Sequence, residues 1–317
     1  MNMTTIYIIL YGVFVVLLSN SCIEPEKPIW DEDVPASEDF YAHNGFWNED
    51  GTKIYFQHVN LSEPENLIVD DIWSYDLNSE ERKSIFRGRA YNGDVNQDET
   101  KFIFHKTSFP LQIFEYDVAN NKEKPLTGTD STNSFENVLL ARYSPDFSKI
   151  LFTIFAGEPR GISIMDTTGR NAEIIVDYGI MGGWFPSGDK VVYVNWLEGR
   201  SSKNAKQIFE ADTDGSNQKV LTDIKDTDLL AGPVVSPDGT KIAFGNDAGE
   251  GNSELFLMDY KTKKSQQVTK GVGYAGAFAW SPDGSQILFS RVIPNVTTNL
   301  FLIDTQTYEV KPLFKKK

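Results

Sequence analysis

Imidazole side chains are the first candidates for chemistry in this sequence, because a neutral imidazole is a common metal ligand and changes charge near neutral pH. There are three, His43, His58 and His105, and Gln57 directly precedes the second. Their spacing matches no metal-binding motif. His43 begins one expected strand, and the other two end others. We therefore expect the fold to bring all three near one face of the molecule.

A second set of polar residues lies at a fixed distance after a recurring turn. Eight residues beyond the third position of that turn stand His58, Lys106, Ile154, Asn195, Asn246 and Arg291, and Trp196 follows Asn195. One interpretation is a polar collar around a central ligand pocket, with tentative ligand-binding residues His58, His105, Lys106, Asn195, Trp196, Asn246 and Arg291. The other interpretation is a row of solvated strand ends with a loop aromatic packed on its neighbour.

The recurring turn is clearest at Ser281-Pro282-Asp283-Gly284, which interrupts an apolar run. Proline presets φ for a tight turn, aspartate can accept hydrogen bonds from the backbone ahead of it, and glycine accepts positive φ. Intact or degraded copies have their third residue at Asp50, Asp98, Asp146, Ser187, Asp238 and Asp283, 41 to 51 residues apart. A period of about 40–50 residues is typical of propeller repeats.

Each turn is followed by an apolar run that ends in aspartate, at Asp76, Asp117, Asp166, Asp212, Asp259 and Asp304. In the last repeat, strands are expected at Ala277–Trp280, Gln286–Ser290, Leu300–Ile303 and Tyr308–Phe314. The pattern predicts an all-β fold, a six-bladed β-propeller of four-stranded antiparallel blades. Because the last repeat supplies four strands from one stretch, the ring would close by side-chain packing or through an edge strand from residues 30–42.

The pattern W-S-P-D-G…I-x-F…L-F-x-M-D resembles the TolB-type β-propeller repeat of bacterial envelope proteins, and the resemblance covers roughly residues 40–314. It implies the fold more strongly than a function, because propellers include lyases, peptidases and plain binding scaffolds. Oligogalacturonate lyases are similar propellers that hold a metal with histidines and a glutamine. They suggest an alternative here, a polyuronide-lyase-like enzyme that uses loop-face polar residues, with His43, His58 and His105 as metal candidates.

In propellers, the hairpin between the first two strands of each blade lies on one face. The loops between second and third strands open on the opposite face, called the loop face below. They are expected at Val59–Asp70, Lys106–Pro110, Phe155–Arg160, Trp196–Lys206, Asn246–Ser253 and Arg291–Thr298. Variable polar loops on a rigid scaffold are a usual place for binding.

The first residues of the chain resemble a bacterial lipoprotein signal. Ile6–Leu18 is an apolar run too short to span a membrane, and Cys22, the only cysteine, follows small residues at its end. We expect a signal peptide over residues 1–21, a lipidated Cys22 with an acidic linker over residues 22–39, and the propeller over residues 40–317. The expected location is the bacterial outer membrane, with the protein facing the periplasm or the cell surface.

Net charge and missing motifs narrow the function classes. A formal net charge of −15 argues against nucleic acid and anionic membrane surfaces as partners. No Gly-x-Ser-x-Gly nucleophile elbow is present, and no histidine follows His105. The sequence therefore favours a non-catalytic scaffold, without a cofactor, that binds an envelope protein or a glycan.

Overall fold

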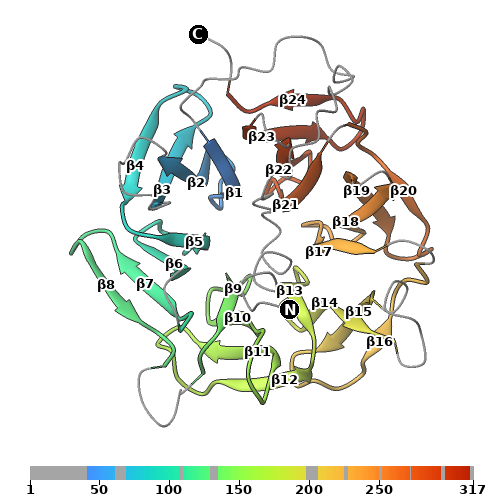
Figure 1. Ribbon diagram of the computed structural model, residues 1–317, viewed down its shortest axis with the longest axis horizontal. Coiled ribbons are helices and arrows are strands. Elements are labelled where there is room, and N and C mark those ends of the chain that lie inside the picture. The colour runs from blue at the N-terminus through green and yellow to red at the C-terminus, as the bar shows by residue number, and fades with distance from the viewer. Residues whose placement is uncertain are drawn as a thin grey trace, which may run out of the picture.

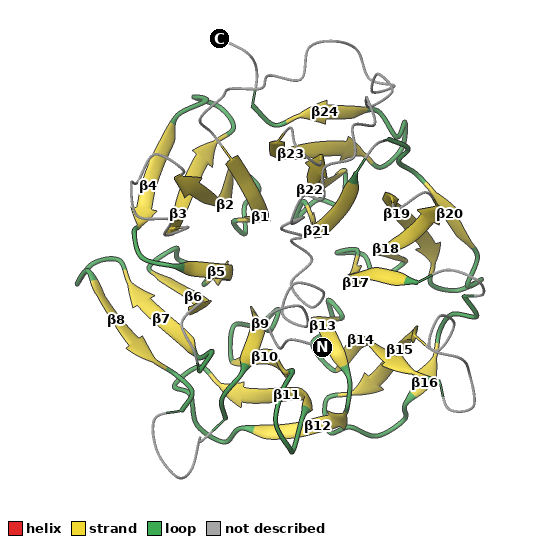
Figure 2. Cartoon of the chain, viewed as in Figure 1, coloured by secondary structure: helices red, strands yellow, loops and turns green. Residues whose placement is uncertain are grey.

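The computed structural model describes residues 41–60, 69–106, 110–128, 135–197, 206–224, 228–249, 252–271, 273–293 and 297–314. These residues form strands, turns and loops, and Figure 2 shows no helix among them. Accordingly, no helix in the described ranges has the length and apolar character needed to cross a membrane. The expected signal peptide, Cys22 and the linker lie outside the described residues.

Four sheets each contain four antiparallel strands in chain order. They comprise β1 (Tyr41–Trp47), β2 (Lys53–Asn60), β3 (Val69–Asp76) and β4 (Arg82–Phe86); β5 (Ala90–Val95), β6 (Lys101–Lys106), β7 (Ile113–Asp117) and β8 (Lys122–Pro125); β9 (Val138–Tyr143), β10 (Lys149–Ile154), β11 (Gly161–Asp166) and β12 (Glu173–Asp177); and β13 (Ile180–Trp184), β14 (Lys190–Trp196), β15 (Lys206–Asp212) and β16 (Lys219–Val220).

The remaining described strands form one eight-stranded sheet. It contains two units, β17 (Leu229–Val235), β18 (Lys241–Gly249), β19 (Asn252–Asp259) and β20 (Ser265–Gln267), then β21 (Tyr274–Trp280), β22 (Gln286–Ile293), β23 (Thr297–Asp304) and β24 (Val310–Pro312). A parallel pair, Ser253 with Tyr274, joins them. The expectation of six separate four-stranded blades is therefore wrong. The Ser253 amide donates to Gly273 at 3.1 Å and its hydroxyl to Ala275 at 3.0 Å, which links β19 to β21.

The sheets follow one another around a ring, as Figure 1 shows, and the first strand of each four-strand unit lies nearest the axis. Apolar side chains fill the spaces between neighbouring sheets. One such cluster joins Phe46 and Tyr55 of the first sheet to Phe102 and Phe104 of the second. The structure is thus a β-propeller, stabilised mainly by burial between sheets.

The recurring turns have the geometry that their residues predict. The Asp283 carboxylate accepts hydrogen bonds from the Ser281 hydroxyl at 2.6 Å and the Ser285 amide at 3.0 Å. The Gln286 amide donates to the Ser281 hydroxyl oxygen at 2.9 Å, and Gly284 has a φ of 72°. The Ser144–Asp146 and Ser236–Asp238 turns have the same bonds, which fix the hairpin between the first two strands of those units.

The axis-facing strands share a bulge that the turn pattern did not predict. Five of them interrupt their pairing around a non-glycine residue with φ between 49° and 60°, at Asn44, Asn92, Leu140, Met181 and Ala277. In β17 the corresponding residue is Gly232. Because Pro233 follows it, helical φ and ψ angles are disfavoured at Gly232. Bulges bend and twist a strand, which fits strands that crowd an axis.

The ring closes between β1 and β21, which lie side by side in Figure 1. The Trp47 indole donates to the Ala279 carbonyl at 3.2 Å, and the Asn44 amide donates to the Ser290 hydroxyl at 2.9 Å. Apolar side chains of both ends, including Phe56 and Leu288, form one cluster. Among the described strands β24 pairs with β23 alone, and side chains join the two ends of the ring. The other expected alternative, an edge strand from residues 30–42, falls almost wholly outside the described residues, so closure by side chains alone stays a prediction.

Candidate functional site on the loop face

The seven tentative ligand-binding residues fall into two groups in the structure. Lys106, Asn195 and Trp196 are at least partly exposed, whereas His58, His105, Asn246 and Arg291 are buried. Successive residues of a strand point to opposite sides of its sheet, so His105 and Trp196 point to the other side than the residues eight positions after each turn. The residues at that shared position differ in burial because their neighbours differ from one repeat to the next. A polar collar around one pocket stays a prediction, and the contacts below show what each side chain does.

The histidines pack against aromatic rings. His43 and His105 lie on either side of Tyr91, each with its ring centroid 5.4 Å from the tyrosine ring, and His58 lies 5.2 Å from Trp73. Within the described ranges no group of three or more His, Cys, Asp or Glu side chains could hold a metal ion. The three imidazoles therefore do not fit a shared metal site.

His105 is fully buried, and this burial dominates its electrostatics. Loss of hydration, together with the nearby Arg142 charge, lowers the pKa of His105 to about 3. The imidazole is consequently neutral at physiological pH.

Gln57 is also buried, and its side-chain oxygen accepts a hydrogen bond of 2.6 Å from the Asn44 side-chain amide group. Both residues belong to the first sheet, so this bond links its two inner strands, β1 and β2.

Arg291 forms a buried ion pair across the two units of the eight-stranded sheet. Its guanidinium contacts both carboxylate oxygens of Glu254, at 2.7 and 3.2 Å, and both side chains are almost inaccessible. The Thr269 hydroxyl and the Gly271 amide donate to the same carboxylate. Asn246 is buried opposite Glu254 on the neighbouring strand. Removing one partner of such a pair costs about 3–5 kcal/mol, because it leaves an uncompensated charge.

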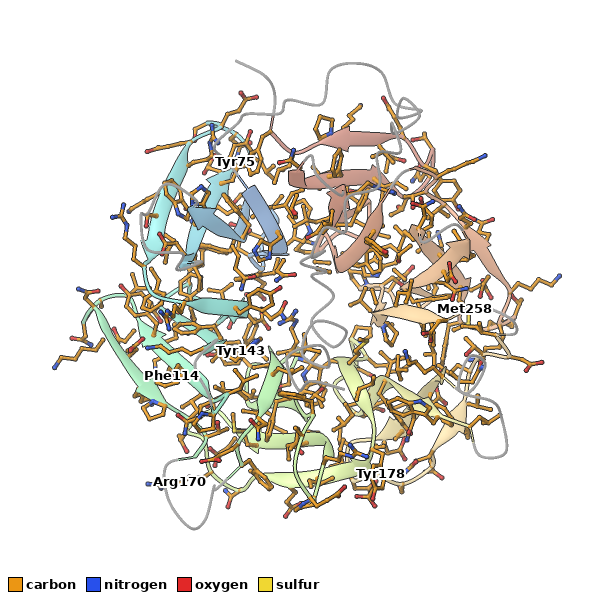
Figure 3. The ribbon with its side chains drawn as sticks, viewed as in Figure 1. Tyr75, Phe114, Tyr143, Arg170, Tyr178 and Met258 are labelled. Carbon is orange, nitrogen blue, oxygen red and sulfur yellow. The ribbon has the colours of Figure 1, made fainter. Side chains whose placement is uncertain are left out.

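Lys106 is directed toward the outer strands of its sheet. Its ammonium group pairs with Glu123 of the edge strand β8 and lies 4.6 Å from the centre of the Phe114 ring. Figure 3 labels Phe114 on the side of the sheet away from the axis. This lysine therefore does not contribute to a central pocket.

Two charged residues near the axis were missed by the turn-based register. Asp94 on β5 accepts hydrogen bonds from the Val95 and Tyr143 amides, both at 2.9 Å, and Arg142 on β9 donates to the Gly93 carbonyl at 3.2 Å. Burial raises the pKa of Asp94, against the attraction of Arg142. The sequence signal that could have identified them was a charged residue within an inner strand. Asp94 and Arg142 each form a hydrogen bond that joins β5 to β9.

Two aromatic side chains near the loop face are exposed. Among the described residues, Trp196 and Tyr178 are the exposed aromatics, at 43% and 50% of their full accessible area. Trp196 ends β14, and Tyr178 follows the end of β12, where Figure 3 labels it on the rim. The Arg160 guanidinium lies 4.9 Å from the centre of the Tyr178 ring.

Hydrogen bonds to backbone groups bring Arg160, Tyr178 and Asn195 together. The Asn195 side-chain amide donates to the Asp177 carbonyl at 3.2 Å, and the Tyr178 backbone amide donates to the Arg160 carbonyl at 3.0 Å. Trp196 is the next residue of β14, on the side that carries Val192 and Val194 and packs toward β17 and β18. The spacing counted from the recurring turns identified Asn195 and the following Trp196. It missed Arg160 and Tyr178, because those two residues come from the preceding sheet.

The TolB β-propeller domain family matches residues 180–317. Among curated proteins, the chain is 28% identical over 137 residues to a "Protein TolB homolog" from Chlorobium luteolum. It is 32% identical over 92 residues to a "Tol-Pal system protein TolB" from Alcanivorax borkumensis. These alignments cover 43% and 29% of this chain, and only 29% and 20% of the two relatives.

Solved structures with the same fold have varied functions. A putative TolB from Agrobacterium tumefaciens has a TM-score of 0.61 at 16% identity, with 76% of this chain and 86% of that one covered. An oligogalacturonate lyase from Vibrio parahaemolyticus has a TM-score of 0.58 at 15% identity, with 89% and 97% covered. At these identities the likeness extends to the fold alone.

Proposed function

We propose that this chain, which contains a TolB-type β-propeller, is a non-catalytic binding scaffold of the bacterial cell envelope. Its loop face would bind an envelope protein or a glycan. The curated relative from Alcanivorax borkumensis carries a Tol-Pal system name, which favours an envelope role. We also propose that the six four-strand repeats, two of which share a sheet, function together as one propeller.

The exposure of Trp196 is the observation that carries this proposal. Other candidates on the same strand ends are engaged, since Arg291 pairs with Glu254 and Lys106 with Glu123. Trp196 instead leaves 43% of its surface open to solvent. An exposed tryptophan on a rigid strand loses little conformational freedom on binding, and tryptophan is enriched among residues that dominate binding energy.

The membrane attachment rests on Cys22. We propose that the chain is cleaved before Cys22 and acylated there, so that residues 22–39 tether the propeller to the outer membrane. More than one acyl chain gives stable anchoring, whereas one gives marginal binding. Mass spectrometry of the mature protein is expected to show an acylated N-terminal cysteine, and Cys22→Ala is expected to release the protein into the soluble fraction. An unmodified thiol at residue 22 would refute the anchor.

Photo-crosslinking on the loop face tests the scaffold function. A photoreactive amino acid in place of Trp196 in the native envelope is expected to capture a partner. The same substitution at Val118, which is 39% exposed at the start of the turn between β7 and β8 on the opposite face, is expected to capture none. Equal capture at both positions, or none at either together with no glycan binding, contradicts the proposal.

The alternative, a polyuronide-lyase-like enzyme, remains a prediction. Its proposed metal ligands, His43, His58 and His105, do not fit a shared site. A metal-dependent lyase would therefore require other ligands. Depolymerisation of polyuronides by the purified protein would support it.

A further inference from the structure

We propose that Arg142 is an anion-binding residue at the propeller axis, where it receives one carboxylate group of a ligand. This site goes beyond the scaffold function, because it is formed by the inner strands β5 and β9 and uses none of the loop-face candidates. A ligand held there would contact the strands nearest the axis, whereas the proposed partner contacts Trp196 at the end of β14. The two can therefore be tested separately.

Strand alternation and one hydrogen bond place the guanidinium of Arg142 at the axis. Arg142 pairs with Leu151, which packs against the fourth sheet, whereas the next residue, Tyr143, packs against the second sheet. The Arg142 side chain therefore starts on the side of β9 away from the second sheet. Its Nη1 nevertheless donates to the Gly93 carbonyl of the second sheet at 3.2 Å. Since β10 occupies one edge of β9, the side chain passes around the other edge, which faces the axis (Figure 1).

One edge of this guanidinium has no protein partner. Nη1 donates to the Gly93 carbonyl and, at 2.8 Å, to the Ala141 carbonyl. Across the described ranges, Nε and Nη2 form no hydrogen bond, and no carboxylate lies within ion-pair distance. Nε and Nη2 lie on one side of the planar group, and this edge can bind both oxygens of a carboxylate. Because the side chain is only partly buried, a ligand can reach it.

Arg291 shows how the same chain neutralises a buried arginine. Its guanidinium meets both carboxylate oxygens of Glu254, at 2.7 and 3.2 Å. The carboxylate that attracts Arg142, that of Asp94, is instead held by backbone amides, one of them from Tyr143 at 2.9 Å. Asp94 therefore acts on the guanidinium without contacting it. The charge of Arg142 is only partly compensated, which leaves its open edge available to a second anion.

Loss of hydration strengthens the case for a ligand. Burial lowers the pKa of Arg142, against the attraction of Asp94, and the guanidinium stays charged at neutral pH. A charged donor that has lost part of its hydration without gaining a protein partner is stabilised by an anion that accepts its hydrogen bonds. Asn92, which precedes Gly93, adds a second polar group. It is 7% exposed, and its side-chain amide forms no hydrogen bond with any described residue.

The charges around the site favour a carboxylate over a phosphate. Asp94 is close enough to influence Arg142, and the formal net charge of the whole chain is −15. Both repel a dianion more strongly than a monoanion. A carboxylate carries a single charge and matches the planar guanidinium with two parallel hydrogen bonds. The site therefore suits the carboxylate of a small acid or of a peptide end.

Titration of the full-length chain with acetate, a minimal carboxylate, tests the site. The Nε–H signal of Arg142 and the backbone amide signals of Gly93 and Tyr143 are followed by NMR, at a constant ionic strength set with chloride. Acetate is expected to shift these signals saturably. Arg142→Lys keeps the charge but loses the planar fork, so it should weaken acetate binding, measured at the two amides, at least about tenfold. Arg170→Lys, in the turn between β11 and β12, should bind acetate as the wild type does.

A second variant and a stability measurement separate binding from folding. Asn92→Asp adds a negative charge beside Gly93 and should also weaken acetate binding at least about tenfold, because like charges repel. Aspartate tolerates the left-handed backbone at this position, where φ is 49°. Acetate is expected to raise the melting temperature of the wild type, since a ligand that binds only the folded state stabilises it, and to raise that of either variant less.

Two further probes identify the ligand. N-acetyl-trialanine with a free carboxyl group assigns the site to a peptide end if it binds more tightly than acetate, and to small acids if it does not. Its C-terminal amide is expected not to bind.

The site is refuted if acetate gives no saturable shift, or if Arg142→Lys and Asn92→Asp both bind acetate as tightly as the wild type. Tighter binding of inorganic phosphate than of acetate would refute a carboxylate site. Because Trp196 takes no part in this site, crosslinking at residue 196 decides the scaffold function independently of these results.

Discussion

Burial determines the chemistry of His105. In the folded protein its pKa lies at about 3, whereas an unfolded histidine titrates near 6.5. The unfolded chain therefore binds a proton that the folded chain excludes between those values. The stability that this neutral imidazole contributes is complete above about pH 6.5 and is lost as pH falls toward about 3.

Replacement of His105 is expected to make the free energy of unfolding depend less steeply on pH in acid. One excluded proton gives a slope of about 1.4 kcal/mol per pH unit, so His105→Phe should reduce the slope between about pH 6 and 4.5 by up to that amount. Urea denaturation at several pH values measures it. Val118→Ala, at an exposed site, should keep the wild-type slope; an unchanged slope in His105→Phe would show that this imidazole is protonated in the fold.

Glu99 joins the first two sheets from a strained position. It has a φ of 57° where four of the other five copies of the turn have glycine and the fifth has Phe147. Its carboxylate accepts hydrogen bonds from the Tyr55 hydroxyl at 2.5 Å, the Asn48 amide group at 2.9 Å and Lys53 at 2.7 Å. Burial opposes ionisation, but these three donors hold the pKa of Glu99 below its usual value.

Glu99→Gly is expected to destabilise the protein even though it relieves the backbone. Relief of a left-handed residue gains about 1–2 kcal/mol, and loss of three hydrogen bonds to a carboxylate costs more, which leaves a net loss of about 1–2 kcal/mol. Chemical denaturation gives the difference. Arg89→Gly, at a φ of 55°, provides the matched control and should be neutral or stabilising. Equal effects of the two variants would contradict a structural role for the Glu99 contacts.

Among the elements of the fold, the hairpin whose turn contains an aspartate is the one that recurs. In the β9–β10 hairpin, Asp146 accepts hydrogen bonds from the Ser144 hydroxyl at 2.6 Å and from the Ser148 amide and hydroxyl. These bonds, the one from Ser144 foremost, lower the pKa of Asp146 to about 2. Similar contacts lower the pKa values of Asp238 and Asp283 in their hairpins.

The hairpins are therefore expected to weaken together in acid. Because the folded pKa values are depressed, their contribution is present above about pH 4 and is lost as pH falls toward 2. Asp146→Ala should lower the melting temperature by a few degrees at pH 7 and make less difference at pH 2, where the wild-type carboxyl is itself protonated. Differential scanning calorimetry at both pH values checks this, and an equal loss at both would assign the effect to packing.

At the scale of the whole molecule, the contact of β1 with β21 is where the two ends of the chain meet. Trp47 donates to Ala279 there, in the same way that Trp280 donates to Val234 between β21 and β17. The second contact lies between units that are also joined by the chain and by a shared sheet. The first depends on side chains, so the ring is expected to open there first.

Hydrogen exchange tests this weakness. Trp47→Phe removes the indole donor but keeps an aromatic ring at this position, and it should increase amide exchange in β1 and β21 severalfold. Trp280→Phe loses the same kind of bond between linked units and should have a smaller effect on exchange. If both variants open their contacts equally, ring closure is no weaker than the other junctions.

The sequence alone determined the local features of this protein, because turn residues act on their own backbone. Ser281, Asp283 and Gly284 specify a hairpin within six residues, and the period of such turns predicted an all-β propeller. It also placed Trp196 just after the expected end of a strand, and the exposure of its side chain came from the structure.

Tertiary structure decided which side chains meet, because partners distant in sequence leave no local signal. Arg291 was predicted as a surface ligand, yet it is buried in an ion pair with Glu254 of another unit. Tyr178 was passed over, yet it is exposed with the Arg160 guanidinium over its ring. The joining of two units into one sheet likewise depended on where Ser253 met Tyr274. Such contacts depend on how the sheets pack around the axis, a non-local property that the repeat pattern does not encode.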